Sequence, residues 1–578
     1  MRLLLLTSLL ALLEWEQVRG VDYCFKTDPL RSQTLEFSSK SVYNRVSGHD
    51  AEKFNVPGCK ATKMWIYHRH GTRLMEKDDI EKAKRLGELR DLIKGNYDKM
   101  QTSPDTNTLC DADLDELQKW RWNSSITVDL DEHLTEQGYE DLRNSAKRYQ
   151  SYYPELLPRT YNSTYYRFGH TDTQRTYESF KAFADGLFDN STVVSSKSSN
   201  ELLRAYDNGE DYFDKNYKGD GSEFMKFITR PIYKDMIANI AKRLRFSKLS
   251  PKDILLMYKM CRFELAWKPK ENSAWCAVFK PEDVTLLNYA EELKNYYGSG
   301  YGFNASDKLN CLVVQDLLTV LNSTVSPNVV AYFAHSPGLQ MLLVSLGIAK
   351  DNDTLRADNF EKMANRKWKL SELVPFGANF VAVKYNCNEA ADNVTEKALF
   401  FLNEKPVEFK WCKNGLCNWS DVLKRYKHFS DGNCKELYSM RLLLLTSMLA
   451  MLEWGQVRSE DDYHSKLPQT LYFKPGCNAT KMWILQTSPM ISKDYINKFK
   501  RFDELRDLLT RYNREMSTNS STNTSCEEDL RWNSNDIDKY AVNQTYEENR
   551  NFAKLYQSNF PQLLPENYNN TYYKVNSA

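Results

Sequence analysis

The segment Arg69-His-Gly-Thr-Arg73 brings together residue types that bind and transfer phosphate. Its two arginines flank His70, and a guanidinium group offers phosphate oxygens a fork of N–H donors. An imidazole among such donors is placed to attack phosphorus, which splits ester hydrolysis into two steps through a phosphohistidine. Gly71 suits a turn whose backbone N–H groups face an oxyanion. The segment therefore predicts a phosphate site in which His70 is the nucleophile.

Two later segments contain candidates for the same site. Arg175 lies in the polar segment 167–179, and His335 directly follows the apolar run 328–334. Each signal alone has a structural interpretation, because a lone surface arginine is usually solvated and a lone histidine is more often a hydrogen-bonded core residue. An Arg-His-Gly triplet also occurs by chance in many proteins. The presence of all three signals in this order favours one shared anion site.

The residues around these candidates indicate strands that end at the chemistry. Residues 63–68 are bulky, apolar or aromatic and predict a buried strand that leads into Arg69. Residues 328–334 predict a second strand, and a leucine-rich helix follows it and ends at Gly347. Because ligands bind at the carboxyl ends of the strands in open α/β sheets, we expect His70 and His335 to meet. An amphipathic helix is expected after the first strand, with these residues on its apolar face: Ile80, Ala83, Leu86, Leu89, Ile93 and Tyr97.

Five segments within residues 59–430 carry a resemblance to a known family: Arg69-His-Gly-Thr-Arg73, Leu134-Thr-Glu-Gln-Gly138, Arg175-Thr176, Leu355-Arg-Ala-Asp-Asn-Phe360 and Leu373-Val-Pro-Phe-Gly-Ala-Asn379. The region resembles the histidine acid phosphatases, most closely the multiple inositol polyphosphate phosphatase branch. The resemblance implies an α/β fold, in which a phosphoglycerate mutase-like core carries a mainly helical second domain. It also implies the site: His70 and His335 as catalytic residues, Arg69, Arg73, Arg175 and His335 as phosphate ligands, and no metal or cofactor. The implied substrates are inositol polyphosphates, with a bisphosphoglycerate as an alternative.

The chain departs from this family at the second histidine. The branch has His-Ala-Glu there, and its glutamate protonates the departing alkoxide, whereas this chain reads His335-Ser336-Pro337. General acid help is worth about 10²–10⁴-fold, a serine hydroxyl is a weak acid and proline has no proton to give. The proton donor is therefore unassigned, and we expect a phosphatase of reduced activity. The alternative is a catalytically impaired pseudoenzyme that binds polyphosphates. Arg73 is also followed by Leu74-Met75, where the family usually has Tyr-Pro.

Composition and the amino terminus limit the remaining classes. A formal net charge of +1, with 27% charged residues, provides no large basic field, so nucleic acid is not an expected partner. Residues 1–20 read as a secretory signal peptide, because Met1-Arg2 precede an apolar run that is too short to span a bilayer. No stable membrane span is expected. The predicted location is the secretory pathway, either outside the cell or in the endoplasmic reticulum lumen.

The cysteines and the glycosylation signals fit that location. Ten of the twelve cysteines precede Met440, and in an oxidising compartment an even set is expected to form disulfides, although spacing does not give their pairing. N-glycans are expected because N-x-S/T triplets begin at Asn123, Asn162, Asn190, Asn304, Asn322, Asn352, Asn393, Asn418, Asn478, Asn519, Asn523, Asn543 and Asn569.

The chain contains a partial repeat of itself. Residues 1–20 return almost unchanged at 440–459, and Cys59-Lys-Ala-Thr-Lys-Met-Trp65 returns as Cys477-Asn-Ala-Thr-Lys-Met-Trp483. In the second copy Leu485-Gln-Thr-Ser-Pro-Met490 replaces the Arg-His-Gly segment, and the counterparts of Arg175 and His335 are missing, so we expect this copy to be inactive. The predicted domains are a signal peptide at 1–20, a histidine phosphatase at 21–439, a second signal-like segment at 440–459 and a truncated repeat at 460–578.

A signal peptide has no physical use inside a secreted chain. We therefore interpret the repeat as a tandem duplication read as one frame, with Met440 as a possible second start. The alternative is a genuine polypeptide of two units with an internal apolar helix. The mass of the native protein separates the two, because only the second interpretation gives a species near 67.5 kDa before glycan addition.

Overall fold

The structure is a computed structural model that describes most of residues 23–434. The described residues exclude 49, 100–106, 189–191, 198–199, 210–220, 305, 326, 389–394, 414 and 431–433, and they also include 469–472 and 481–484. The chain divides into two units, Met1–Leu449 and Ala450–Ala578. All the candidate site residues lie in the first unit.

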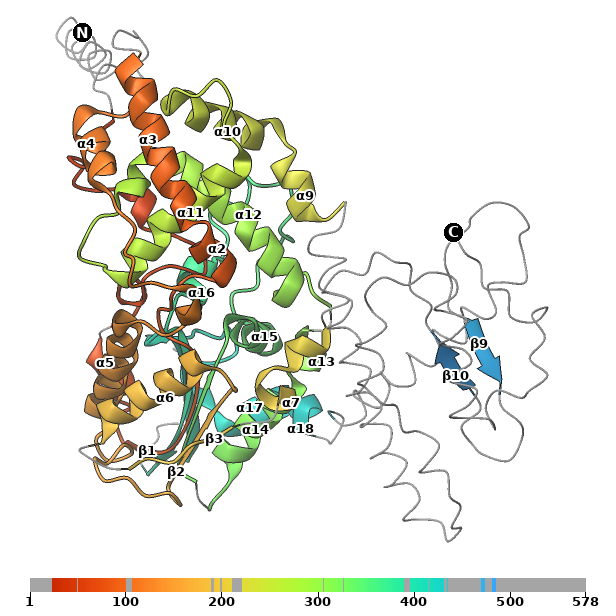
Figure 1. Ribbon diagram of the computed structural model, residues 1–578. Helices are drawn as coiled ribbons and strands as arrows, with labels where there is room; N and C mark the ends of the chain where they lie inside the picture. The colour runs from red at the N-terminus through yellow and green to blue at the C-terminus, as the bar shows by residue number, and fades with distance from the viewer. Residues whose placement is uncertain are drawn as a thin grey trace, which may run out of the picture. The chain divides into compact units, whose positions relative to one another are not determined.

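A mixed sheet of eight strands runs through the first unit in the order β3-β2-β4-β1-β5-β6-β7, with β8 beside β6 (Figure 1). The strands β1 to β4 are parallel, whereas β5 is antiparallel to β1. Arg69 pairs with Ala334 in the register of β1 and β4, so the next residue of each strand is one of the two histidines. The strands are β1 (Cys59–Arg69), β2 (Tyr166–His170), β3 (Ser196–Lys197), β4 (Val329–Ala334), β5 (Asn379–Cys387), β6 (Glu396–Leu402), β7 (Lys405–Pro406) and β8 (Cys417–Asn418).

Both faces of the sheet are covered by helices, which explains the almost continuous apolar runs of its strands. Met64 and Ile66 of β1 face one apolar cluster, which includes residues of α5 (Glu136–Tyr152) and α6 (Gln174–Leu187). Trp65 and Tyr67 face the other cluster, with α14 (Cys311–Asn322) and α15 (Ser336–Leu346). The strand predicted from residues 63–68 is confirmed, and so is the helix after the second strand, which Gly347 ends with φ 75°.

A helical region extends from one end of the sheet (Figure 1). The expected amphipathic segment forms two helices, α2 (Lys77–Glu81) and α3 (Ala83–Lys99), and all six predicted apolar residues are buried. The region shares one apolar cluster with the α14 and α15 face of the sheet, so its core is continuous with the sheet domain. Its other main helices are α4 (Asp111–Lys119), α9 (Glu223–Ile228), α10 (Pro231–Arg243), α11 (Pro251–Trp267) and α12 (Pro281–Ser299). The remaining helices are short and lie around the sheet: α7 (Asn200–Leu203), α13 (Ser306–Leu309), α16 (Leu370–Leu373), α17 (Trp419–Arg425) and α18 (Lys427–Ser430).

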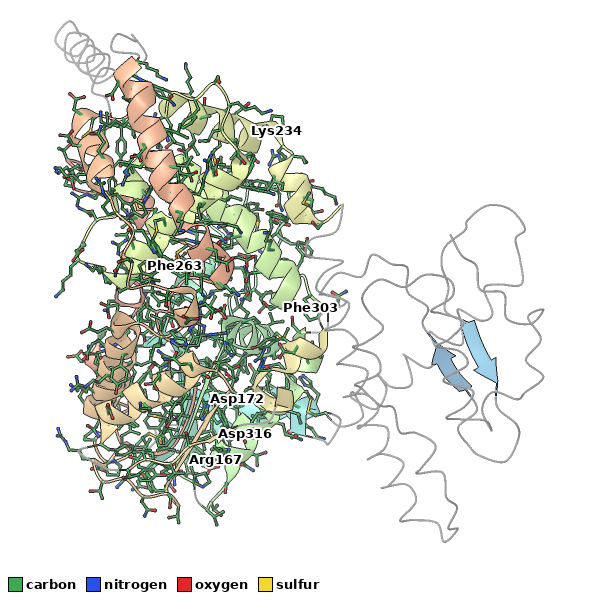
Figure 2. All side chains as sticks on the ribbon, viewed as in Figure 1. Arg167, Asp172, Lys234, Phe263, Phe303 and Asp316 are labelled. Atoms are coloured by element: carbon green, nitrogen blue, oxygen red, sulfur yellow. A yellow bond between two sulfur atoms is a disulfide. The ribbon has the colours of Figure 1, made fainter. Side chains whose placement is uncertain are left out.

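Two polar networks tie these layers together. Asp316 of α14 accepts hydrogen bonds from Trp65 Nε1 at 2.8 Å and from Arg167 Nη2 at 2.7 Å, and Figure 2 labels Arg167 and Asp316 beside each other. On the far edge, Glu404 is almost fully buried and accepts from Tyr43 and from the guanidinium group of Arg148, both at 2.7 Å. Buried charges of this kind are stable only when they are paired.

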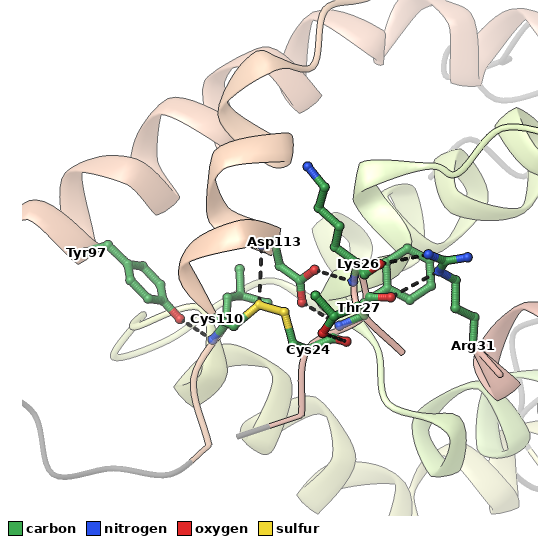
Figure 3. The surroundings of a disulfide bond; sticks show 9 residues. Cys24, Lys26, Thr27, Arg31, Tyr97, Cys110 and Asp113 are labelled. Atoms are coloured by element: carbon green, nitrogen blue, oxygen red, sulfur yellow. Dashed lines mark hydrogen bonds between the residues drawn. A yellow bond between two sulfur atoms is a disulfide. The ribbon is translucent and has the colours of Figure 1, made fainter. Parts of the chain in front are cut away.

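All ten cysteines before Met440 are paired. The disulfides are Cys24–Cys110, Cys59–Cys387, Cys261–Cys276, Cys311–Cys434 and Cys412–Cys417. Figure 3 shows the first, beside which the Asp113 carboxylate accepts the backbone N–H of Phe25 and of Lys26, each at 2.8 Å. Cys24, Cys110 and Asp113 lie close enough together to hold a metal ion, but both sulfur atoms are bonded to each other. This cluster therefore offers no thiolate ligand.

Two further findings concern the membrane and the second unit. Among the described residues, none of the helices combines the length and the apolar character that a membrane crossing needs. In the second unit, β9 (Gln469–Tyr472) and β10 (Lys481–Ile484) form an antiparallel pair. The predicted signal segments at 1–20 and 440–459 and most of the truncated repeat lie outside the described residues, so the domain boundaries stay predictions.

Candidate active site

The loop after β1 presents His70 with a defined tautomer. His70 is almost fully buried, and its Nδ1 lies 2.9 Å from the carbonyl oxygen of Gly71. A carbonyl oxygen only accepts, so Nδ1 carries the proton and Nε2 of the neutral ring has the free lone pair. Burial and the nearby Arg69 lower the pKa of His70 well below 6.5. The imidazole is therefore a neutral potential nucleophile at physiological pH.

His335 lies beside His70, as the strand ends require. It is the residue before α15, and the centroids of the two rings are 5.5 Å apart. Its Nε2 is 2.9 Å from the hydroxyl of Thr171, at the end of β2. Burial and Arg175 lower the pKa of His335 well below 6.5, so this ring is also neutral in the empty site. The two histidines are thus brought together from positions 265 residues apart.

The backbone amides of the phosphate loop differ from our expectation. The N–H of His70 donates to the carbonyl oxygen of Ala334 at 2.9 Å, and the N–H of Gly71 donates to Ser179 Oγ at 3.0 Å. These two amides therefore do not face an anion, and side chains must supply the donors. Glycine is required at 71 for a steric reason, because a Cβ there would lie 2.4 Å from the carbonyl oxygen of Gly138.

The Leu134-Gly138 segment packs against the loop that follows β1. The Thr135 hydroxyl donates to the carbonyl oxygen of Thr72 at 2.9 Å, and the backbone N–H of Thr135 donates to the same oxygen at 2.9 Å. A Cβ on Gly138 would lie 2.2 Å from that oxygen. The start of α5 and the loop after β1 therefore approach as closely as glycine allows. This close contact explains why the Leu134-Gly138 segment matters for the site although it carries no reactive group.

Arg69 connects the loop to two other segments. Its Nη1 donates to the backbone carbonyl oxygens of Ser39 and of Val374, the second at 2.6 Å, and its guanidinium group lies 4.6 Å from the centroid of the Phe376 ring. Burial and the neighbouring Arg73 lower the pKa of Arg69 to about 9. Arg69 therefore holds the amino-terminal segment at the site in addition to lining the cavity.

Arg73 and Arg175 converge on one carboxylate that sequence reasoning missed. Glu132 Oε1 lies 3.2 Å from Arg73 Nη2, and Glu132 Oε2 lies 3.1 Å from Arg175 Nη1. The same Nη2 of Arg73 lies 2.9 Å from Glu76 Oε1, and the guanidinium group lies over the ring of Phe263, which Figure 2 labels where the helical region meets the sheet. Glu132 has φ 55°, the left-handed region that non-glycine residues rarely adopt. Its proximity to the Leu134-Gly138 segment was the only available signal.

A cavity of about 480 Å³ surrounds these groups. Among the residues that the structure describes, its lining has eight basic side chains and two acidic ones, Glu132 and Glu291. Three of the basic residues, Arg69, Arg73 and Arg175, were predicted from the sequence. The other five come from separate segments without a motif and were not predicted: Lys40, Arg204, Lys259, Arg262 and Lys294. A cavity with this excess of positive charge attracts polyanions.

The wall beside His335 has no carboxyl group where the family places its donor. Ser336 and Pro337 form the first turn of α15, and the Ser336 hydroxyl accepts a hydrogen bond from Gln340 Nε2 at 3.0 Å. The next residue is Gly338, where a Cβ would lie 2.1 Å from the hydroxyl oxygen of Tyr67. A nearby tyrosine, Tyr206 of the 3-10 helix η6 (Ala205–Gly209), also lines the cavity.

Comparisons with known proteins agree on one family. Residues 62–401 match the family described as the histidine phosphatase superfamily, branch 2. Multiple inositol polyphosphate phosphatase 1 of Drosophila melanogaster is 53% identical over 443 residues, which cover 76% of this chain and 94% of that protein. The human protein of the same name is 26% identical over 399 residues, which cover 64% of this chain and 79% of that protein. The solved phytase from D. castellii has the same fold, with a TM-score of 0.55 at 18% identity over 70% of this chain and 88% of that one.

Proposed function

This chain belongs to branch 2 of the histidine phosphatase superfamily, and we propose that it hydrolyses phosphomonoesters of inositol polyphosphates through a phosphohistidine on His70. It is a phosphatase, and its relatives named multiple inositol polyphosphate phosphatase 1 support the substrate class. The observation that carries the proposal is the pair of neutral histidines, 5.5 Å apart, in a cavity lined by eight basic side chains.

The chemistry follows from the groups around His70. Nε2 of His70 attacks phosphorus, and the bond between phosphorus and the ester oxygen breaks. Arg69, Arg73 and Arg175 stabilise the charge on the equatorial oxygens, and His335 donates its ring N–H to one of them. Water then attacks the phosphohistidine and releases inorganic phosphate. The proposal requires no metal or cofactor.

The substrate class follows from the charge of the cavity. One phosphate needs only the two histidines and three arginines, and five more basic side chains line the described part of the cavity: Lys40, Arg204, Lys259, Arg262 and Lys294. Arg204, Lys259 and Arg262 are paired with Asp207, Asp79 and Glu291, so further phosphates would have to share them with these carboxylates. A ring with several phosphates can use them at once, and a bisphosphoglycerate would use fewer. We therefore expect affinity to rise with the number of phosphates on the ligand.

We propose that turnover is reduced relative to an enzyme with a carboxylic donor. Ser336 and Pro337 occupy that wall, and general acid catalysis contributes about 10²–10⁴-fold. A polyphosphate-binding pseudoenzyme is the second candidate, and the same missing carboxyl group favours it.

The test compares two esters with the full-length protein. An aryl phosphate has a leaving group that needs no proton, whereas an inositol phosphate does need one. We expect hydrolysis of both, with a lower kcat on the inositol ester, and loss of both activities in His70→Ala. Equal and high rates on the two esters would contradict reduced turnover. If neither ester reacts and His70 is never phosphorylated, while phosphate still protects against thermal unfolding, the pseudoenzyme is correct.

We also propose that the chain enters the secretory pathway and carries N-glycans. Five disulfides support an oxidising compartment. Five of the predicted acceptor asparagines are exposed, namely Asn123, Asn162, Asn304, Asn322 and Asn352. Treatment of the secreted protein with an N-glycosidase should lower its mass, and an unchanged mass would contradict the proposal.

A further inference from the structure

The departing alkoxide needs a proton, Ser336 and Pro337 provide no carboxyl group, and a tyrosine lines the same cavity beside His335. We propose that the Tyr206 hydroxyl is the proton donor of this enzyme, an inference that rests on the proposed phosphatase function. Tyr206 lines the cavity together with Ser336 and Pro337. Its ring lies edge-on to His335, at 86° between the planes and 6.4 Å between the centroids.

Packing holds the ring of Tyr206 in this position. It packs against a small apolar cluster of Ala205, Phe303, Leu309 and Met341, and Figure 2 labels Phe303 beside α13. The residue before the 3-10 helix is Arg204, and its Nε forms an ion pair with Asp207 at 2.6 Å. The phenol is therefore held between an apolar cluster, an arginine of the cavity and the imidazole of His335.

The hydrogen bonding of Tyr206 leaves its proton available. The phenol has a side-chain hydrogen bond with Arg204. A guanidinium group only donates, so the phenolic oxygen accepts and its own hydrogen can be given to another acceptor. Burial raises the pKa of Tyr206, so the hydroxyl stays protonated at neutral pH. The negative charge of Asp207 raises the pKa further, whereas Arg204 and Arg175 lower it and so favour the phenolate, which is the state formed when the proton leaves.

Among the described residues of the cavity lining, the two carboxylates and the Tyr258 phenol are already engaged. Burial alone would raise the pKa of Glu291, but Arg262 and Lys40 lower it to about 2, so this group is ionised. Glu132 is paired with Arg73 and Arg175. The Tyr258 hydroxyl donates to Asn288 Oδ1 at 2.7 Å.

Lys40 is the main competitor for the role of donor. Burial lowers the pKa of this ammonium group to about 7, so it can release a proton at neutral pH. Its Nζ donates to Ser39 Oγ at 3.1 Å, and that hydroxyl in turn contacts Glu291. Lys40 also lies 5.9 Å from the Phe376 ring, on the wall formed by Arg69. It thus belongs to the Glu291 side of the cavity, whereas Tyr206 contacts His335.

The two half-reactions balance with this donor. In the first, His70 forms a bond to phosphorus, the ester oxygen leaves with the bonding electrons, and the Tyr206 proton moves to it to give the alcohol. In the second, water attacks the phosphohistidine, the bond between phosphorus and nitrogen breaks, and the proton of water returns to the Tyr206 phenolate.

The experiment measures kcat/KM of the full-length Tyr206→Phe variant on p-nitrophenyl phosphate and on inositol hexakisphosphate. Phenylalanine keeps the packing and removes only the hydroxyl. General acid catalysis contributes about 10²–10⁴-fold, and nitrophenolate leaves without it. We therefore expect the loss on the inositol ester to exceed the loss on the aryl ester by ~30-fold or more.

Two variants serve as comparisons. Tyr233→Phe changes another cavity tyrosine, one that packs on Phe227, and should show no such selectivity between the esters. Lys40→Met should lower both activities by a similar factor through lost phosphate affinity. An equal loss on both esters in Tyr206→Phe, or a selective loss in Lys40→Met instead, would overturn the proposal. If the unmodified protein hydrolyses neither ester, the proposed function itself has failed.

Discussion

Glu132 forms ion pairs with two of the arginines assigned to phosphate, Arg73 and Arg175. Its two carboxylate oxygens lie 3.2 Å from Arg73 and 3.1 Å from Arg175. To reach them its backbone adopts φ 55°, a conformation that costs a non-glycine residue about 1 kcal/mol or more. An incoming phosphate must displace this carboxylate or share its arginines. Glu132 therefore limits how tightly the site holds a single phosphate.

Replacement of Glu132 by glutamine should tighten phosphate binding. The neutral amide keeps the size of the side chain and removes the competing charge. The pair is partly exposed, so we expect a modest gain of about threefold to tenfold in the affinity for inorganic phosphate. Isothermal titration calorimetry measures it. The exposed Glu136→Gln, four residues along the same segment, should leave the affinity unchanged, and weaker binding by Glu132→Gln would contradict the prediction.

At the scale of elements, much of the site could be predicted because its signals are local. The strand before Arg69, the helix that Gly347 ends and the meeting of His70 with His335 all follow from apolar patterns and from one rule of α/β sheets. Lys40, Glu132 and Tyr206 could not be predicted, because long-range contacts bring them to the cavity. Lys40 is held there through contacts of neighbouring residues, such as the hydrogen bond from Arg69 to the Ser39 carbonyl oxygen. The use of the His70 and Gly71 amides by Ala334 and Ser179 was equally invisible in the sequence.

The contact between α5 and the phosphate loop predicts a sensitive glycine. A Cβ on Gly138 would lie 2.2 Å from the Thr72 carbonyl oxygen, so Gly138→Ala must push the loop or the helix away. We expect a loss of about 1–3 kcal/mol of stability, typical of overpacking, and a fall in kcat/KM larger than the fall in folded protein. Gly95→Ala in α3, where nothing lies within 4 Å of the added methyl group, should instead be neutral or stabilising. Thermal unfolding and aryl phosphate kinetics measure both.

The middle of β1 makes stability depend on pH. His68 is fully buried, its ring stacks on Phe333 at 5.4 Å, and burial lowers its pKa to about 3. Below pH 6.5 the unfolded chain binds a proton on His68 that the folded chain excludes. The contribution of neutral His68 to the free energy of unfolding is therefore complete above pH 6.5 and falls as the pH drops toward 3. The slope is about 1.4 kcal/mol per pH unit for one histidine.

The variant His68→Phe tests this dependence. Between pH 6.5 and 4.5 its free energy of unfolding should fall by about 2–3 kcal/mol less than that of the unmodified protein, because one proton uptake site is removed. Replacement of the exposed His428 by asparagine should leave the pH profile unchanged. Parallel profiles for His68→Phe and the unmodified chain would show that His68 is not the group responsible.

At the scale of the whole molecule, disulfides close loops of very different length. Cys59–Cys387 joins the outer ends of β1 and β5 across 328 residues, whereas Cys412–Cys417 spans 5. A crosslink stabilises a fold mainly by restricting the unfolded chain, and more so for a longer loop. The first disulfide should therefore contribute more to stability than the last.

Paired alanine variants measure this difference. Loss of Cys59–Cys387 should cost about 6 kcal/mol in the loop-entropy description, and loss of Cys412–Cys417 about 2 kcal/mol. Denaturant unfolding of the two double variants, expressed under the same conditions, provides the comparison. Equal costs would mean that strain or residual structure, and not loop length, controls the stabilisation.

The position of β1 has a consequence for biosynthesis. The strand β1 is translated early, yet its neighbours in the folded sheet are β4 and β5. Met64 of β1, for example, pairs with Val329 and Val383, which are translated much later. Until those residues emerge from the ribosome, β1 is an apolar segment whose backbone N–H and C=O groups lack their sheet partners on both edges. It can therefore pair with other exposed strands and aggregate. The nascent polypeptide should depend heavily on chaperones over this interval, and slowing translation between 70 and 329 should increase aggregation rather than relieve it.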